Sequence, residues 1–433
     1  MRFIIYSLSL MFSLGIWAQE SKYLHLDSLL SKVESNNLKL QISEAQTTAA
    51  KSEYQQSNAV FLPNISANYS VISTTNPLMA FGSKLNQEIL TQNDFNPALL
   101  NDPDRIENFS TTISVEQGLL NFDKFAERKA AKYAYLAQQY QGERLKQALN
   151  LETKTSFMQL QLAYKNRDVM KKALKTAEAY LKQITDFYDE GLVQKADVLA
   201  VNIRVNDLET KLDQAEASIK NISDQLAFLM QDNSEVVYIP KTKLNLNLHQ
   251  TNNQNTLESR ADLQAINLGV QAQEQLLKSN QLNYLPRLNA FGNLQLFDDE
   301  FLQADAQGYL VGVQLKWDIF KGYQRIAKTK TEKAKLNIAK LEAKAYQDEA
   351  QIEIKSTKRQ LDNLSKAITT AQISVNQAKE ALRIIEDRFN EGLEKSSDVL
   401  AAQSKVELQE LKYFQTIFNY NYTSYYLNFL TNN

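Results

Sequence analysis

The residue types that carry most enzyme chemistry are scarce or scattered in this chain. It has no Cys, and its two His residues, His25 and His249, are far apart, so we expect no thiol nucleophile, disulfide or metal cluster of ordinary spacing. The sequence contains no Gly-rich phosphate loop and no nucleophile elbow. Its carboxylates are interspersed with Lys and Arg on helical faces, a pattern typical of solvated surfaces. We therefore predict no catalytic site, no cofactor and no bound metal.

One spacing does stand out, because it occurs twice. Asp189–Leu199 and Asn390–Leu400 share Glu-Gly-Leu followed by Asp-Val-Leu, at an offset of 201 positions. A glycine can adopt the left-handed conformation that ends a helix, and an Asp six residues later can accept hydrogen bonds from the free amides of a new helix. The pattern predicts two hairpin tips, residues 190–197 and 391–398, each joining two long antiparallel helices.

Long helices must position these tips, and the composition favours them. None of the six Pro residues lies between 104 and 239 or after 286, and these stretches are rich in Ala, Leu, Lys, Gln and Glu. Apolar residues at alternating spacings of three and four predict helices from Phe122 to Glu190 and from Gly322 to Glu391. The helix after each tip continues such a pattern, which indicates a coiled-coil seam.

Two β-hairpins are predicted before the long helices, at residues 64–118 and 287–320. Each follows a Leu-Pro pair, Leu62-Pro63 or Leu285-Pro286, and each alternates apolar with polar residues at a period of two. Residues 73–105, between the first two strands, contain three Pro residues and many Asn and Asp, and we expect a loop there. The polar face of the hairpins includes Asn64, Ser66, Asn68, Ser70, Asn289, Asn293 and Gln295.

The chain order therefore predicts a signal and two repeats. Residues 1–18 have a basic start, a short apolar core and a small final residue, as in a secretory signal peptide; an N-terminal membrane anchor is the alternative. A first structural repeat (19–230) and a second (257–433) each contain a helix, a β-hairpin, a long helix, a tip and a helix. Residues 231–256 are expected to be an irregular linker with a short strand.

Four amphipathic strands cannot close a membrane-spanning sheet by themselves, since such a sheet must have no open edge. Three chains would supply twelve strands, an even number suited to a barrel with an aqueous lumen. The net charge of −2 gives no basic footprint for nucleic acid. The predicted fold is mainly α with a small β part: duplicated helical hairpins form a coiled-coil tunnel, and four strands join a trimeric twelve-stranded outer-membrane barrel.

With these features in place, the chain resembles the TolC-like outer-membrane efflux proteins over nearly all of its predicted mature length. The resemblance rests on the duplicated layout, the Leu-Pro pairs, Arg260-Ala261-Asp262-Leu263, Trp317-Asp318-Ile319-Phe320 and the two tips. It implies a homotrimer in the lipid of the outer membrane, with a helical tunnel in the periplasm. It also implies two partners, a periplasmic adaptor and an inner-membrane transporter, and passive export through a duct without a catalytic site.

The resemblance also suggests roles for residues at the tips. Asp398 matches an acidic ring at the tunnel mouth; the alternative is that it only caps its helix. The second acidic position of the family is Ala401 here. Asp197 matches a residue that links to a basic position of the second tip, and that position is Glu394 here. Lys395 is a neighbour that can substitute, so we hypothesise an Asp197–Lys395 pair.

Two further sets of residues have alternative interpretations. Gly191, Leu192, Gly392 and Leu393 match the adaptor-docking tips of the family; alternatively, they form structural helix ends with a hydrophobic contact. Four aromatic residues near strand ends are candidates for membrane-interface belts or for packing between strands: Tyr69, Phe297, Tyr309 and Trp317.

Two other functions remain open at the level of sequence. A periplasmic adaptor also contains a helical hairpin, but it would have one hairpin and β-rich segments rich in Gly and Val. An exported coiled-coil scaffold would also show apolar seams, but the four alternating strands disfavour it. An outer-membrane exit duct of a tripartite efflux or type I secretion system therefore remains the leading prediction.

Overall fold

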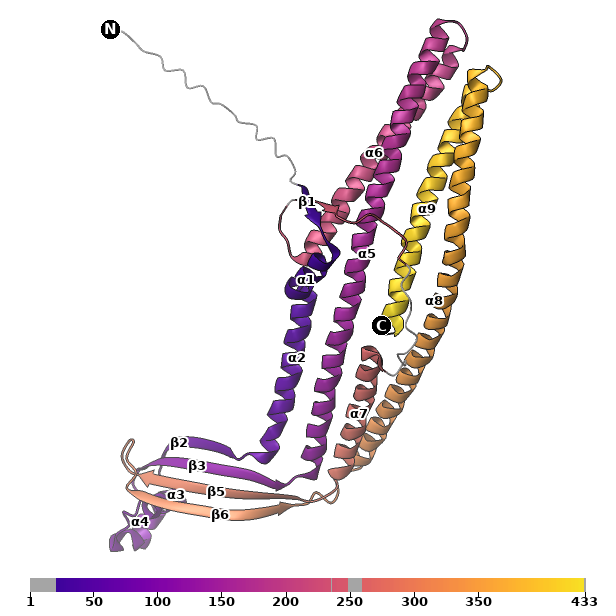
Figure 1. Ribbon diagram of the computed structural model, residues 1–433. Coiled ribbons are helices and arrows are strands. Elements are labelled where there is room, and N and C mark those ends of the chain that lie inside the picture. Colours follow the sequence, from indigo (N-terminus) through magenta and orange to yellow (C-terminus); the bar gives the residue numbers. More distant parts are fainter. Residues whose placement is uncertain (1–20, 235, 248–258, 432–433) are drawn as a thin grey trace, which may run out of the picture. The chain divides into compact units, whose positions relative to one another are not determined.

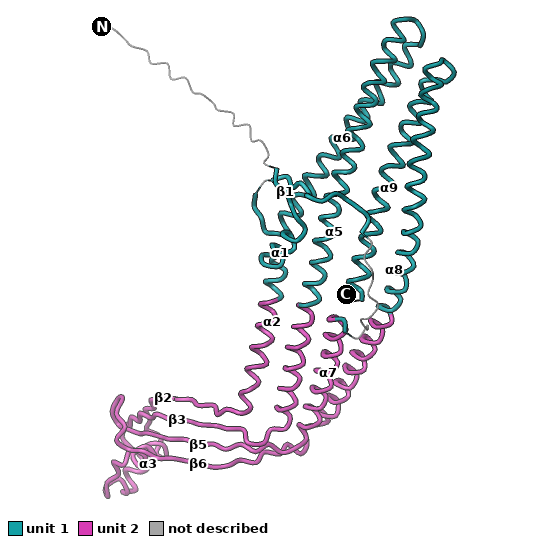
Figure 2. The backbone as a smooth tube through the Cα atoms, in the orientation of Figure 1, with its two compact units in different colours: residues 1–43, 143–260, 349–433 teal, residues 44–142, 261–348 magenta. Residues whose placement is uncertain are grey.

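The structure is a computed structural model and describes residues 21–234, 236–247 and 259–431. The predicted signal peptide and residues 235 and 248–256 of the predicted linker lie outside this range. The chain divides into two compact units (Figure 2): unit 1 comprises Met1–Ser43, Glu143–Arg260 and Glu349–Asn433, and unit 2 comprises Glu44–Gly142 and Ala261–Asp348. Each unit combines segments from both halves of the sequence.

Long helices dominate the described elements, and Figure 1 labels most of them. In chain order they are β1 (Ser21–Leu24), α1 (Leu26–Asn36), α2 (Leu38–Gln56), η1 (Ser57–Phe61), β2 (Asn64–Thr74), α3 (Pro77–Asn86), η2 (Gln92–Phe95), α4 (Pro97–Asn101), β3 (Ile106–Leu120), α5 (Phe122–Asp189), α6 (Lys195–Met230), β4 (Val237–Pro240), α7 (Ala261–Leu282), β5 (Arg287–Asp298), β6 (Ala306–Lys316), α8 (Gln324–Asn390) and α9 (Ser396–Thr431). Among the described residues, no helix has both the length and the apolar character needed to cross a membrane.

In unit 1, the helix pairs α5–α6 and α8–α9 pack through the predicted seams. Leu160 and Ile184 on α5 and Val201 and Leu226 on α6 are completely buried. The matching seam of α8 is also buried at Ile368, Ala371, Val375, Ala378 and Phe389. Spacings of three and four place these residues on one helical face, so the pattern predicted the core of these hairpins correctly.

Unit 1 also contains a small parallel sheet that the sequence only partly indicated. The short strand expected in the linker is β4, and its partner is β1, with Ser21 opposite Val237 and Leu24 opposite Pro240. Tyr238 of β4 is buried in the core that α1, α5 and α6 share. β1 was not predicted, because a four-residue strand shows too little alternation and its partner lies more than 200 residues away in the sequence.

In unit 2, four strands form one antiparallel sheet in the order β2-β3-β5-β6. The register aligns Ile65 with Val115, Val115 with Gly292, and Gly292 with Val311, so the apolar positions of all four strands share one face. The polar positions share the other face, where Ser70 and Ser110 are joined by a hydrogen bond of 2.6 Å between their hydroxyl oxygens. The predicted alternation is therefore confirmed, and the pairing of β3 with β5 joins the two hairpins.

The segment between β2 and β3 corrects one expectation, since it contains α3, η2 and α4 in place of a loop. Each α-helix begins at an Asn-Pro pair: the Asn76 side chain accepts a hydrogen bond from Met79 N, and the Asn96 side chain accepts one from Ala98 N. Proline fits the first helical position, because its missing N–H would have no partner there. These prolines start helices, although clusters of Pro, Asn and Asp more often indicate a loop.

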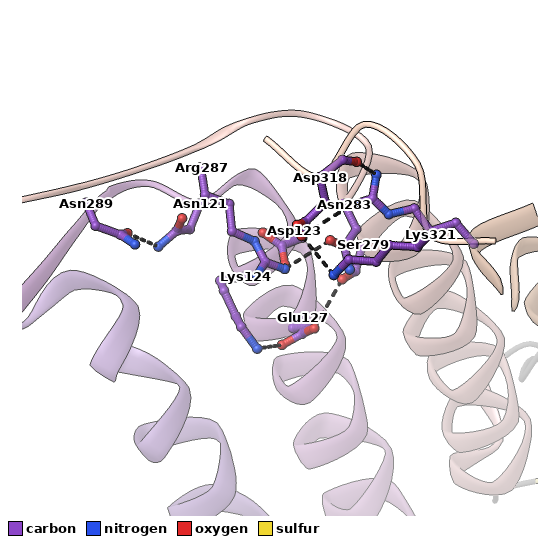
Figure 3. Close-up of polar contacts among 11 residues, drawn as sticks. Asn121, Asp123, Lys124, Glu127, Ser279, Asn283, Arg287, Asn289, Asp318 and Lys321 are labelled. Carbon is purple, nitrogen blue, oxygen red and sulfur yellow. Dashed lines mark hydrogen bonds and ion pairs between the residues drawn. The ribbon is translucent and has the colours of Figure 1, made fainter. Parts of the chain in front are cut away.

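A polar network joins the start of β5 to the nearby ends of α5 and α7 (Figure 3). Arg287, at the start of β5, contacts the buried Asp123 at 2.6 Å and Asn283 at 3.0 Å. Asn121 donates to Asn289 at 3.2 Å, and its side chain lies against Gly118, where a Cβ would come within 2.4 Å. The β3–β5 register shifts between Gly118 and Leu120, and a side chain at Gly118 would displace the Asn121 amide from its place at this bulge.

Candidate functional site

The two tips end their first helices with the same backbone geometry. Gly191 and Gly392 both have φ of 74°. Gly191 N donates to Tyr188 O and Leu192 N to Phe187 O, while Gly392 N donates to Phe389 O and Leu393 N to Arg388 O, all at 2.8–2.9 Å. This pair of bonds is the Schellman motif, which satisfies carbonyls at the helix end and requires a left-handed residue. The structural role of both glycines is therefore confirmed.

The leucines after these glycines do not complete that motif with a buried contact. Leu192 is 66% exposed and Leu393 is 61% exposed. A Schellman end commonly packs this residue back onto the preceding helix. Here both leucines instead expose apolar side chains at the ends of the hairpins. Burial within the described chain therefore gives no reason for an apolar residue at either position.

The two aspartates cap the second helix of each tip from its first turn. The Asp197 carboxylate accepts a hydrogen bond from Gln194 N at 3.0 Å, and the Asp398 carboxylate accepts one from Lys395 N at 3.3 Å. α6 and α9 begin at Lys195 and Ser396, so each Asp is the third helical residue and reaches backward. The turns between the helices are therefore shorter than the predicted 190–197 and 391–398.

Asp197 also joins the two tips to each other, through a contact that the sequence did not reveal. The Ser396 hydroxyl donates to Asp197 Oδ1, and Ser396 is only 5% exposed. Within one chain Asp197 therefore contacts Ser396 in place of the hypothesised Lys395. Asp398 is exposed, and no side chain of the first tip bonds to it in the part of the chain that the structure describes.

Charged residues on the second tip form a separate group. Glu394 pairs with Arg388, in the last turn of α8, with 2.8 Å between Arg388 Nε and Glu394 Oε1. Lys395 is exposed beside this pair. Glu394 occupies the position where the resemblance implies a basic residue. Its partner, Arg388, belongs to the same tip.

An aromatic cluster packs the tips together beneath these polar contacts. Tyr180, Ile184, Val201, Phe389 and Val399 form one buried group. The Tyr180 and Phe389 rings meet edge to face, with centroids 5.7 Å apart. Burial raises the pKa of Tyr180 well above its ordinary value of 10.0, and the nearby carboxylates of Asp197 and Glu386 raise it further.

A buried ion pair links the two hairpins farther along unit 1. Arg204 of α6 contacts Glu407 of α9, and their side chains are only 13% and 9% exposed. Lys211 approaches the same carboxylate at 3.6 Å. A buried charge is tolerated only when it is paired, so the separation of α6 from α9 would break this pairing at a cost in free energy.

In unit 2, the sheet exposes its apolar face. On β6, Val311, Val313 and Leu315 are 69%, 63% and 66% exposed, and on β2 Ile65 is 65% exposed. Such a face is unusual on a protein surface in water, where large apolar patches mark interaction sites. The outer edges of β2 and β6 have no strand partner within the described chain.

The four candidate belt residues divide between the faces and ends of the sheet. Tyr69 and Tyr309 lie on the apolar face, in register with Thr111 and Leu294 respectively. Trp317 follows β6, is 58% exposed and donates from Nε1 to Tyr284 O at 3.0 Å. Phe297 differs, because its register with Ser110 and Ala306 places it on the polar face.

Further aromatic residues extend these groups and were not identified from the sequence. At the end of the sheet away from the long helices, the Phe301 ring meets the rings of Tyr69 and Phe109 edge to face at 5.9 and 6.0 Å. Near Trp317, Phe320 and Tyr323 are 73% and 72% exposed. The turn residues had no strand periodicity, and so the alternation pattern gave no signal for them.

Within the described residues, no group of three or more His, Cys, Asp and Glu residues could hold a metal ion. His25 precedes α1 as its N-cap residue, and His249 lies outside the described range.

Comparison with known proteins gives one family and a set of similar folds. The family model described as outer membrane efflux protein matches residues 29–230 and 253–423. A search of the curated proteins finds no match to the chain.

Solved structures share the fold at low sequence identity. A membrane protein from Pseudomonas aeruginosa has a TM-score of 0.83 at 17% identity, with 94% of this chain and 93% of that chain covered. The Campylobacter jejuni CmeC outer membrane channel has a TM-score of 0.81 at 15% identity, with coverage of 94% and 85%. The outer membrane protein VceC from Vibrio cholerae has a TM-score of 0.79 at 17% identity, with 94% of both chains covered.

Proposed function

The chain belongs to the outer membrane efflux protein family, and from this premise we propose that it is the outer-membrane exit duct of a tripartite efflux or type I secretion system. In this role three copies pass a substrate passively from a periplasmic adaptor and an inner-membrane transporter to the outside. No step of this function requires bond chemistry. The tunnel formed by the helical hairpins lies in the periplasm.

The amphipathic sheet of unit 2 is the observation that carries this proposal. One face is apolar and exposed at Val311, Val313 and Leu315, and the other face holds Asn68, Asn293 and other polar residues. The apolar face can contact lipid, and the polar face can contact water. An amphipathic wall of this kind separates a membrane from an aqueous lumen.

The two open edges of the sheet supply the reason for several copies. Unpaired backbone groups of β2 and β6 cannot be left in lipid, because each costs several kcal/mol without a partner. If β6 of one copy pairs with β2 of the next, three copies close a barrel of twelve strands. β2 and β6 have 11 residues each, about the length that a tilted membrane strand needs.

Aromatic residues near the two ends of the sheet fit the two membrane interfaces. Tyr69 and Tyr309 lie toward the end that carries α3 and α4, and Trp317 lies at the other end. Tyr309 and Trp317 are eight residues apart, or roughly 26 Å along the strand. Tyr and Trp rings place a polar edge at the membrane interface while their bodies stay in lipid, and the Trp317 edge donates to Tyr284 O. Phe297 is left out of this assignment, because its side chain lies on the polar face.

The tips supply the periplasmic mouth and the adaptor contact in this proposal. Asp398 is exposed at the second tip, and three copies around one axis would place three such carboxylates at the mouth, favouring cations. Asp197 holds the two tips together through Ser396. Leu192 and Leu393 provide exposed apolar contacts for the adaptor, while Glu394 and Lys395 set the charge beside them.

Adjacent residues on β6 allow a direct test of the duct. Val313 and Gln314 are both exposed but lie on opposite faces. We expect Val313→Lys to cost about 2–4 kcal/mol of membrane stability, because its charge would enter lipid, whereas Gln314→Lys would face water. The measurement is recovery of detergent-resistant trimers from the outer membrane, followed by conductance in planar bilayers.

Two outcomes would contradict the proposal. Equal recovery of both variants would mean that the apolar face does not contact lipid. A soluble monomeric or dimeric rod would favour the alternatives, a periplasmic adaptor or an exported coiled-coil scaffold.

The adaptor contact is tested separately at the tips. The chain has no Cys, so a single introduced Cys reports only its own position. We expect Leu192→Cys and Leu393→Cys to crosslink to the adaptor at least fivefold more than Ile203→Cys, which is 69% exposed on α6 and away from the turn. Equal crosslinking at the three positions would argue against docking at the tips.

A further inference from the structure

The insertion between β2 and β3, residues 75–105, is folded and contains α3, η2 and α4. Its helices begin at Asn76-Pro77 and Asn96-Pro97 with side-chain caps. Lys84 of α3 contacts Asp94 of η2 at 2.8 Å, and the rings of Phe81 and Phe95 meet edge to face with centroids 5.7 Å apart. These contacts hold α3, η2 and α4 together in one conformation.

Gln87 anchors the insertion to the end of the sheet. This residue is 4% exposed, and its Nε2 lies 2.8 Å from Glu107 O, 2.9 Å from Asn108 Oδ1 and 2.9 Å from Asp298 O. The acceptors belong to β3 and β5, at the end of the sheet near α3 and α4 (Figure 1). A buried amide that donates to two strands holds α3 firmly in place.

The Asn108 side chain shows which face of the sheet α3 covers. Asn108 pairs with Ile72, two positions from the Ser110–Ser70 pair, whose joined hydroxyls lie on the polar face. Side chains two residues apart on a strand share a face. Asn108 therefore lies on the polar face, and α3, which reaches it through Gln87, packs over that face.

The helical period of α3 then fixes which side chains point away from the sheet. Ala80 and Ser83 are buried at 1% and 9% exposure, and they lie on the same helical face as Gln87. Leu78 and Leu85 lie seven residues apart on the opposite face and are 81% and 56% exposed. The helix thus turns an apolar stripe, Leu78 and Leu85, away from the polar wall.

Resting on the proposed closure of three copies into one barrel, we propose that α3 lies inside the outer mouth and that Leu78 and Leu85 of the three copies meet to form an apolar constriction. The apolar stripe of each copy therefore contacts α3 of the neighbouring copies. α3 begins three residues after β2, an edge strand at which the next copy joins, so the stripe continues that interface. An apolar ring restricts hydrated ions by excluding water.

This constriction complements the mouth at the tips. Asp398 would place carboxylates at the periplasmic entrance, whereas leucines narrow the exit. Small hydrated ions would pass the exit poorly, while a substrate with apolar surface could displace the leucines. The outer mouth thereby selects for apolar character, independently of the partner proteins.

Cysteine crosslinking in the full-length trimer tests the constriction. We expect Leu85→Cys and Leu78→Cys to crosslink between copies with a short bismaleimide at least fivefold more than Val313→Cys. Val313 is a matched control, since it is 63% exposed but lies on the apolar face of β6. Trimers that show no excess crosslinking at Leu78 and Leu85 would overturn the inference and leave the duct intact.

A second measurement uses conductance. Leu85→Glu would hydrate the ring, and we expect at least a twofold rise in basal conductance, whereas Ile203→Glu, which places the same charge at an exposed position of α6, should leave conductance unchanged. Conducting trimers whose conductance is unchanged by Leu85→Glu would overturn the constriction alone. Failure of the unmodified protein to form trimers would overturn the proposed function, and the constriction with it.

Discussion

The two tips have nearly the same backbone and opposite side-chain environments. Gly191 and Gly392 share φ of 74°, and Asp197 and Asp398 both cap from the third helical position. Yet Phe389 is 7% exposed, while the residue at the same place in the first tip, Tyr188, is 41% exposed. The repeat preserves the turn, whereas the contacts between the tips give each a separate role.

The contrast between Asp197 and Asp398 teaches the same lesson for polar groups. Asp197 accepts a hydrogen bond from Ser396 of the other tip, and the residue equivalent to Ser396 in the first tip is Lys195. No reciprocal bond to Asp398 is therefore available from a serine there. Asp197 of the first tip therefore bonds to the second tip, whereas the Asp398 carboxylate of the second tip stays exposed.

The largest expected effect is at the unequal aromatic pair. Phe389→Ala should lower the local unfolding free energy of the tips by about 3–5 kcal/mol, because it opens a cavity in the aromatic cluster. Tyr188→Ala should cost under about 1 kcal/mol, since its side chain is substantially exposed. Native-state hydrogen exchange of tip amides measures both, and equal losses would show that the two positions share one environment.

The aspartates should differ by a smaller amount. Asp197→Ala should cost about 2–3 kcal/mol, through loss of a cap and of a charge-assisted hydrogen bond, and Asp398→Ala about 1 kcal/mol, through loss of the cap alone. In bilayers, Asp197→Ala should raise closed-state conductance, and Asp398→Ala should reduce cation selectivity. Asp197→Asn, which keeps an acceptor oxygen, is the control. Unchanged closed-state conductance in Asp197→Ala would count against the link between the tips.

The glycines test the part of the comparison that is symmetrical. Gly191→Ala and Gly392→Ala should each cost about 1–2 kcal/mol, because both place a Cβ in left-handed backbone. Neither added Cβ would have a neighbour within 4 Å, so the backbone conformation alone sets the cost. A difference between the two tips larger than about 1 kcal/mol, measured by hydrogen exchange, would mean that their surroundings alter the turn.

The smallest effect concerns Tyr180, which has no counterpart in the second hairpin. Because its folded pKa is raised, its contribution to stability is complete below its ordinary pKa of 10.0 and is lost as the pH rises above that value. Its hydroxyl has no hydrogen-bond partner among the described residues. Tyr180→Phe should therefore leave stability unchanged or raise it by up to about 1 kcal/mol at pH 7 and weaken the alkaline decline. Persistence of the full decline in this variant, followed by circular dichroism, would assign it to other groups.

Much of the fold could be predicted because it depends on periodic burial. Seam residues such as Leu160 and Val375 lie in the core, and alternation separated Ile65 from Ser66, because helix and strand periods fix which side chains share a face. Errors arose where one residue type has two structural roles. The helices after Asn76 and Asn96 were missed because Pro was counted as a breaker, and the tip helices begin before the aspartates because those side chains reach backward.

The sequence by itself determined the long helices, the four strands of the antiparallel sheet, the two glycine turns and the amphipathic faces, since each follows from residues close together in the chain. Only the tertiary structure decided that β3 pairs with β5, that Ser396 bonds to Asp197, and that α3 covers the polar face. Ser396 and Asp197 lie 199 positions apart, and Gln87 and Asp298 lie 211 apart. No local period records such a meeting, because it depends on how separately formed elements pack. The two tips show the difference most clearly: their turns follow from eleven residues, and their unequal roles follow from the fold.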